Sequence, residues 1–181
     1  ELVKEFDYHN MSKSPAVFDI QKLRWMNGEY LKAMDSETFY AAAEPYLKKA
    51  LTKDFDLHRI AEMVRTRIEV YPDIPEIVAF FEQVPEYDIA LFTNKKAKTD
   101  AEKSLATLKD LLPRLEASED FTNDALFEML KAYTQENGCK VNAVMWPLRI
   151  AVSGQSVTPA GATEIMDIIG KDESIARIRA A

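Results

Sequence analysis

The stretch DAEKSLATLKDLLPRL, residues 100–115, shows most clearly what kind of fold the chain adopts. Its residues Leu105, Leu108, Leu112 and Leu115 are three or four positions apart, which is the spacing of one face of an α-helix. The positions between them are mostly polar, so the opposite face suits water. The stretch therefore predicts a long amphipathic helix that packs into a core along one side.

The same spacing recurs before and after this stretch. Seven further segments place apolar residues on one helical face, namely those with Ile20, Leu23 and Met26; Phe39, Ala43 and Leu47; Leu57, Ile60, Val64 and Tyr71; Ile77, Phe80 and Phe81; Leu126, Leu130 and Tyr133; Val144, Leu148 and Ala151; and Ile165, Ile168 and Ile169. A last short helix is expected around Ile175 and Ile178. Helical periodicity thus dominates the chain.

Residues that start or end helices fall between these segments. The candidate N-caps are Asp19, Ser36, Asp56, Thr122 and the pair Thr158-Pro159. We expect Gly138 and Gly170 to end helices, and Pro45 to kink or divide the helix in which it lies. The one strand-like run, Tyr87 to Phe92, is short and is interpreted as an extended connection.

These patterns predict an all-α chain of two stacked helical subdomains. The expected boundaries are residues 1–32 for a leading segment and junction, 33–94 for the first subdomain and 95–181 for the second. Helical bundles of this kind host unrelated functions, so the fold class alone does not indicate what the chain does.

The charge and the cysteine count limit the classes of function. A net charge of −7 argues against a protein that binds nucleic acid through bulk positive charge, although it leaves room for a local basic surface. The lysines between Lys95 and Lys109 are such a group, or else a solvated helix face. The single cysteine, Cys139, rules out a disulfide within the chain and suggests a reducing cytoplasm.

Several kinds of site and segment are not expected. No apolar stretch approaches the roughly 20 residues that span a bilayer, and the first residues do not resemble a signal peptide. His9 and His58 join no cluster of cysteines, histidines or carboxylates, so we predict no metal site. No nucleophile–base pair and no Gly-rich phosphate loop is recognisable, so we predict no catalytic residue.

Three segments point to a family. They are SKSPAVFD with KLRWMN between Ser12 and Asn27, MWPLRIAVSG from Met145 to Gly154, and the segment from Val157 to Gly170. The first resembles the junction before the anticodon-binding region of bacterial-type glutamyl-tRNA synthetases, and the second resembles their Pro-Leu-Arg-x-Ala-Leu-x-Gly segment. The resemblance covers nearly the whole chain and is weakest from about residue 81 to 111.

The resemblance implies a function as well as a fold. The intact protein would attach glutamate to its tRNA with ATP and a magnesium ion. This chain would be its C-terminal part, a cytoplasmic monomer that holds tRNA(Glu) mainly at the anticodon loop and lacks both catalytic residues and a cofactor. Met11 to Ser14 looks like the ATP-contacting loop of class I synthetases, but Asn10 stands where that loop has lysine.

Two arginines match family positions that contact the anticodon. Arg67 matches the arginine that contacts the first anticodon letter, and on a helical wheel it falls inside the apolar stripe of Ile60 and Val64, whereas Arg65 points away. Without RNA, Arg67 would either extend past the helix end into solvent or pair with a carboxylate such as Glu69. Arg149 matches the arginine of Pro-Leu-Arg and lies off its apolar stripe, where a plain surface arginine is the alternative.

Other residues are weaker candidates. Trp146 lies near Arg149 on the wheel and is either a stacking platform or core filler. Thr158 and Pro159 match a family turn that contacts the anticodon, and ordinary helix capping would also account for them. Ala162 and Thr163 stand where the family has larger apolar residues, so their packing against a base is doubtful.

The remaining candidates concern the RNA backbone. Lys131 aligns with a basic family position and is either a phosphate contact or a solvated lysine. Lys13 and Arg24 would touch the tRNA nearer its core. The alternative for the whole chain is a helical protein-interaction module unrelated to translation, and a stand-alone enzyme is a third possibility without a supporting motif.

Overall fold

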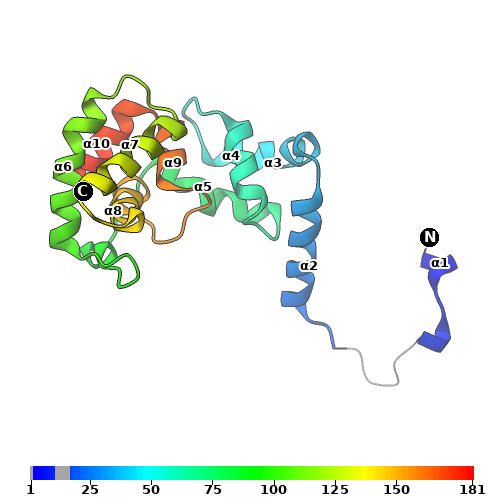
Figure 1. The fold of residues 1–181 in the computed structure, drawn as a ribbon. Helices are drawn as coiled ribbons and strands as arrows, with labels where there is room; N and C mark the ends of the chain where they lie inside the picture. Colours follow the sequence, from blue (N-terminus) through cyan, green and yellow to red (C-terminus); the bar gives the residue numbers. More distant parts are fainter. Residues whose placement is uncertain (1, 11–16) are drawn as a thin grey trace.

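The computed structural model describes residues 2–10 and 17–181, and helices joined by short loops make up this part of the chain (Figure 1). The α-helices are α1 Leu2–Glu5, α2 Ile20–Ala33, α3 Ser36–Ala50, α4 Leu57–Arg65, α5 Ile74–Glu82, α6 Ala101–Ala117, α7 Asn123–Glu136, α8 Val141–Ser153, α9 Ala162–Ile169 and α10 Lys171–Ala180. The short 3₁₀ turns are η1 Tyr8–Asn10, η2 Tyr71–Asp73 and η3 Ile89–Phe92. The described residues form no β-strand, and the all-α prediction is confirmed.

Two groups of helices lie side by side. In the first, α3 packs against α4 and α5, while in the second α8 packs against α6, α9 and α10 and α7 packs on α9 (Figure 1). One continuous apolar core runs through both groups. It contains fully buried residues such as Phe39 and Phe80 from the first group and Leu111 and Leu148 from the second. The exact subdomain boundary stays a prediction.

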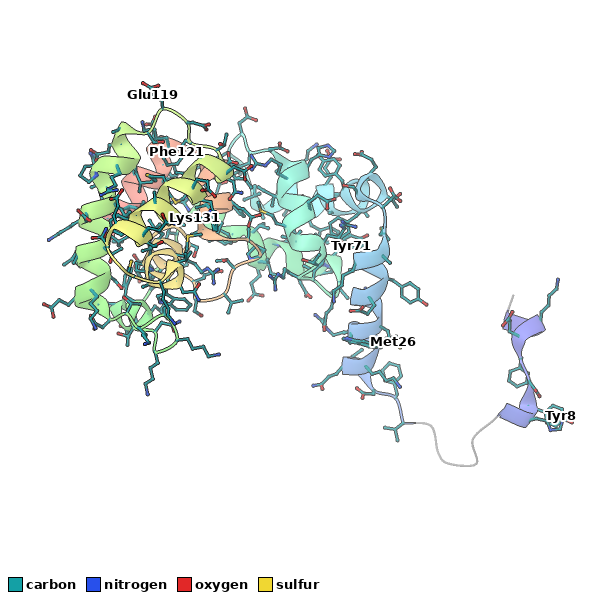
Figure 2. All side chains as sticks on the ribbon, viewed as in Figure 1. Tyr8, Met26, Tyr71, Glu119, Phe121 and Lys131 are labelled. Carbon is teal, nitrogen blue, oxygen red and sulfur yellow. The ribbon has the colours of Figure 1, made fainter. Side chains whose placement is uncertain are left out.

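Helix α2 extends away from both groups (Figure 1). The predicted cap is confirmed, because the Asp19 carboxylate accepts hydrogen bonds from the backbone N–H groups of residues 21 and 22. Within α2 only Gly28 and Leu31 are buried. Its apolar side chains Ile20, Leu23, Trp25, Met26 and Tyr30 are exposed, and Figure 2 labels Met26 on this projecting helix.

Helices α3 and α4 correct two of the expected details and confirm a third. Asp35, and not Ser36, caps α3, because its carboxylate accepts from the N–H of residue 38. The helix also continues through Pro45 and is not divided there. Ala43 and Leu47 are completely buried on either side of the proline, and this packing holds the helix together despite one missing hydrogen bond. The cap by Asp56 on α4 is as predicted.

Two other expectations about local structure are wrong. Thr122 precedes α7, but its hydroxyl bonds to Asp120 and does not cap the helix. The strand-like run from Tyr87 to Phe92 is not extended throughout, because the 3₁₀ turn η3 occupies its last four residues. The Asp88 carboxylate caps that turn. Gly138 and Gly170 do follow the ends of α7 and α9, both with a positive φ that glycine tolerates.

Polar contacts join the two groups along a seam. The Arg177 side chain, only 7% exposed, donates to the carbonyl oxygens of Phe80 and Phe81 at the end of α5 and of Val152 in α8, each at 2.8 Å. Arg59 of α4 forms an ion pair with Asp167 of α9 at 2.6 Å. These contacts fix α4 and α5 against α8 and α9, and the candidate site lies where those helices meet.

Candidate nucleic-acid interface

Three adjoining hollows follow the seam. The arginine hollow, about 300 Å³, is lined by Arg67, Arg149, residues 156–161 and Glu164. The α4 hollow, about 370 Å³, shares Pro159, Ala160 and Glu164 with it and adds side chains of α4 such as Arg59 and Met63. The tryptophan hollow, about 240 Å³, shares Arg149 and adds Asn94, Lys96, Ala97, Asn142, Met145 and Trp146. Neighbouring hollows share lining residues, and the three together are called the track.

Arg67 reaches this track from a position that the helical wheel did not predict. Helix α4 ends at Arg65, so Arg67 lies in the following turn, is exposed, and does not belong to the apolar stripe. Arg65 is the arginine that packs inward, donating to the carbonyl of Met34 at 2.6 Å and to Glu62. The wheel prediction failed because the helix ends before Arg67, and Ile68, which is 2% exposed, is the residue that packs into the core there.

The Arg67 guanidinium has no ion pair or hydrogen bond within the described part of the chain. Glu69, its expected partner, instead accepts from Arg24 at 2.9 Å. That ion pair and a second one with Asp73 raise the pKa of Arg24 and join α2 to the segment before α5. The alternative of an Arg67–Glu69 pair is therefore wrong.

Arg149 lies half-buried on α8, on the other side of the same hollow. Its Nε is shielded from solvent and bonds to nothing in residues 2–10 and 17–181. Burial, and then the positive charge of Arg67, lowers the pKa of Arg149 below its usual value. A half-buried cation beside a second cation is unfavourable unless a partner compensates it. The pair therefore favours an anionic or strongly polar ligand.

The turn from Ser156 to Gly161 lines the arginine hollow together with the two arginines. Thr158 and Pro159 are not the start of α9, as the sequence suggested, because the helix begins at Ala162 and Gly161 precedes it. The Glu164 carboxylate accepts from the Gly161 N–H at 2.7 Å and takes over the capping role. The Thr158 hydroxyl is buried and donates to the carbonyl of Ala160 at 2.7 Å.

The backbone of this turn has N–H groups without a partner among the described residues. Within the described residues, no hydrogen bond is made by the N–H groups of Ser156, Val157, Thr158 or Ala160. Free backbone N–H groups beside two guanidinium groups can donate to base edges or phosphate oxygens. Ala162 and Thr163 do not contribute a surface, because they are 1% and 3% exposed and face the core.

Trp146 lies in the tryptophan hollow beside Arg149, as its helical position predicted. Its Nε1–H donates to the carbonyl of Leu91 at 2.8 Å, which fixes the orientation of the ring. The side chain is half-buried, so part of the indole packs against the core. The anchored ring thus fills space in the core and also lines the hollow, and its role as a stacking platform stays a prediction.

The other candidates lie apart from the track. Figure 2 labels Lys131 on α7, where it is exposed and pairs with Glu128 at 3.1 Å. It lines none of the three hollows. Arg24 lies on α2, where its Nε pairs with Glu69 and its Nη2 with Asp73. Lys13 and the segment from Met11 to Ser14 lie outside the described residues.

Sequence reasoning missed some residues of the track. Asn142 and Met145 of α8 and Glu164 of α9 line it, together with Ser156 and Val157. A signal for Glu164 was present, because a glutamate three residues after Gly161 matches the capping pattern. Asn142 and Met145 gave no signal, since they belong to the site only through the position of α8 beside the 94–97 loop.

No group of three or more histidine, cysteine or carboxylate side chains in the described ranges is placed to hold a metal ion. No helix in those ranges combines the length and the apolar character that crossing a membrane requires. The lining of the track offers guanidinium groups, the backbone of the 156–161 turn and an aromatic ring.

Comparison with known proteins shows the family to which the chain belongs. Residues 38–181 match the family described as the anticodon binding domain. The chain belongs to the anticodon-binding domain family. This match covers every residue of the three hollows and supports a role in translation over that of an unrelated protein-interaction module.

Several curated relatives are glutamate–tRNA ligases. The glutamate–tRNA ligase of Lachnoclostridium phytofermentans is 55% identical over the whole chain, and that of Clostridium novyi is 48% identical over 99% of it. The chain spans 37% and 38% of these relatives. A crystal structure of a glutamate tRNA ligase from Elizabethkingia meningosepticum, in complex with its amino acid, matches 99% of the chain with a TM-score of 0.80 and 26% identity, the chain covering 35% of it.

Proposed function

We propose that this anticodon-binding domain holds the anticodon loop of tRNA(Glu), as the C-terminal part of a glutamate–tRNA ligase. The observation that carries the proposal is the pair Arg67 and Arg149, two guanidinium groups that face one hollow and have no partner among the described residues. The relatives named glutamate–tRNA ligase support the choice of tRNA. In the intact protein this domain would act in the cytoplasm as a monomer.

The chemistry of the track suits single-stranded RNA. Anticodon bases unstack easily, and proteins recognise them by stacking and by hydrogen bonds to their edges. A guanidinium can do both, because it is planar and presents five donors in a fixed arrangement. Arg67, Arg149 and the 156–161 turn line the same hollow, so a base held there would lie near both guanidinium groups and the backbone of the turn. Trp146 supplies an aromatic ring next to Arg149.

Glutamate attachment itself would take place elsewhere in the ligase. The relatives are almost three times as long as this chain, and ATP and magnesium would be bound by their remaining part. The described residues do not fit either group, since they contain neither a cluster of metal-ligating side chains nor a Gly-rich phosphate loop. The residues of this domain would bind and position the tRNA only.

The proposal is tested by titrating the domain with the anticodon stem-loop of tRNA(Glu) and with a loop that differs in one anticodon letter. Replacing Arg67 or Arg149 by alanine is expected to weaken binding of the correct loop by about 1–3 kcal/mol, the range known for direct base contacts in DNA. The preference over the altered loop should shrink as well. The matched control is Arg179→Ala, which removes an exposed arginine on α10 that lines none of the three hollows.

The outcomes separate the alternatives. Equal losses for both loops would show that the arginines contact phosphates and do not recognise bases. If the folded domain bound neither loop, the proposal would be wrong, and the protein-interaction module would become the better hypothesis.

A further inference from the structure

A hairpin of three lysines stands at the end of the track. Residues Asn94 to Thr99 form a tight turn before α6, and it carries Lys95, Lys96 and Lys98. All three side chains are exposed. These side chains form no ion pair or hydrogen bond with any residue that the structure describes. Three such positive charges within four positions are unusual on a chain with a net charge of −7.

The hairpin is held in one shape by its backbone. Asn94 and Thr99 exchange backbone hydrogen bonds of 2.9 and 3.2 Å. The Asn94 side chain accepts from the N–H groups of Lys96 and Ala97 at 2.9 and 3.0 Å. Ala97 is 5% exposed and fixes the tip against the protein. The lysines are therefore presented from a rigid support and not from a loose loop.

Lys98 has a backbone conformation that lysine rarely adopts. Its φ is +58°, and no other residue except glycine has a positive φ in the described ranges. Glycine adopts this conformation without steric cost, and asparagine with little. The backbone conformation at position 98 is therefore energetically unfavourable for a lysine. Strain of this kind is found at functional sites, where the side chain serves another purpose.

The position of the hairpin connects it to the RNA track. Asn94, Lys96 and Ala97 line the tryptophan hollow together with Trp146 and Arg149. RNA that occupied this hollow would have its backbone close to the three ammonium groups. A lysine ammonium is a compact point charge that binds phosphate well but has no fixed geometry for distinguishing bases.

We propose that the Asn94–Thr99 hairpin is a phosphate-binding arm that contacts the RNA backbone next to the nucleotides in the tryptophan and arginine hollows. The arm rests on the proposed function, because it presumes that RNA occupies the track. Its contribution is electrostatic, so it strengthens binding equally for every anticodon. It thus supplies affinity, while Arg67 and Arg149 supply selectivity.

The backbone strain provides a clean test. Lys98→Gly removes the charge and relieves the conformation, so the thermal unfolding midpoint should not fall. A second variant, Lys95→Gln with Lys96→Gln, removes the other two charges. Lys98→Arg keeps the charge, and Lys109→Gln is the matched control, because Lys109 is an exposed lysine on α6 that lines none of the three hollows.

Binding of the correct and the altered anticodon stem-loops is measured at a series of salt concentrations. The logarithm of the association constant is plotted against the logarithm of the salt concentration, and the slope of this plot should become shallower by about 0.7 for each RNA phosphate that a variant no longer neutralises. At the lowest salt concentration, binding should be roughly three- to tenfold weaker. The ratio of the two affinities should stay constant. Lys98→Arg and Lys109→Gln should keep the wild-type slope.

Unchanged slopes in both lysine-removing variants would overturn the proposal of a phosphate-binding arm. A change in anticodon preference with no change in slope would overturn it as well. The proposed function fails separately. If the wild-type domain bound both loops equally while the lysine variants had shallower slopes, the proposal that the domain recognises anticodon bases would be wrong. The proposal that the hairpin binds phosphates would be supported. Absence of any binding by the folded wild-type domain would overturn both.

Discussion

Two arginines at the seam between the helical groups have opposite surroundings. Arg177 is buried and makes four hydrogen bonds, three to carbonyl oxygens of α5 and α8 and one to Glu173. Arg149 is half-buried on α8, has no such partner among the described residues and faces a second arginine. The difference shows how one residue type either holds a fold together or remains available for a ligand. Three predictions test this comparison.

The largest effect is expected for Arg177→Met. Methionine keeps an unbranched apolar stem but leaves the buried carbonyl oxygens of Phe80, Phe81 and Val152 without their donor. Unpaired buried polar groups are costly, and we expect a loss of about 3–5 kcal/mol in the free energy of unfolding. Urea denaturation measures it. Arg179→Met is the control, and an equal effect of both changes would contradict a special role for Arg177.

The matched change, Arg149→Met, should behave differently. It removes a half-buried charge that no described residue compensates, next to the charge of Arg67. The free energy of unfolding should stay the same or rise by about 1 kcal/mol, while RNA binding weakens. The same urea experiment measures the first part. A loss of stability comparable to that of Arg177→Met would mean that Arg149 also supports the fold. The contrast between the two arginines would then be wrong.

A smaller effect concerns pH. The hydrogen bond from Arg177 lowers the pKa of Glu173 in the folded chain, and so does the charge of Arg177, although burial opposes this. A carboxylate whose pKa is depressed by folding stabilises the folded state above its ordinary pKa of about 4.3, and this contribution is lost as the pH falls through the lowered value. Because Glu173 is partly exposed, we expect less than about 1 kcal/mol.

The measurement compares wild type and Glu173→Gln in urea near neutral pH and at a pH of about 3, below the ordinary carboxyl pKa. The difference in stability between the two proteins should be present near neutral pH and shrink in acid. A difference that did not change with pH would show that the ion pair contributes nothing beyond its hydrogen bond. Glu116→Gln, which alters the exposed pair with Arg179, serves as the control.

The sequence predicted the helices and part of the site, for physical reasons that particular residues make clear. Leucines at helical spacing require a buried face, and the caps by Asp19 and Asp56 depend on residues two or three positions away. Arg149 and the 158–159 turn were predicted from the family motif, and the structure brings them into one hollow. Such features are local or are carried by a contiguous motif.

Features that depend on distant contacts could not be predicted. Helix α4 ends at Arg65, and Ile68 is buried in the segment that follows. The helical wheel assumed that the helix continues, so it placed Arg67 inward and Arg65 outward, which is the reverse of what the structure shows. The partners of Arg177 are backbone carbonyl oxygens nearly a hundred positions away in the case of α5. Backbone acceptors leave no trace in the order of side chains, so no motif marks this residue.

The anchored ring of Trp146 has a spectroscopic consequence. The chain contains two tryptophans, and the other, Trp25, is 57% exposed on the projecting helix α2. Trp146 lies in the hollow that the lysine hairpin borders, with its indole N–H held by a carbonyl oxygen. The domain therefore carries its own pair of tryptophan fluorophores, one in the proposed interface and one on the projecting helix α2. A Trp25→Phe protein would emit from the interface alone, without an attached dye.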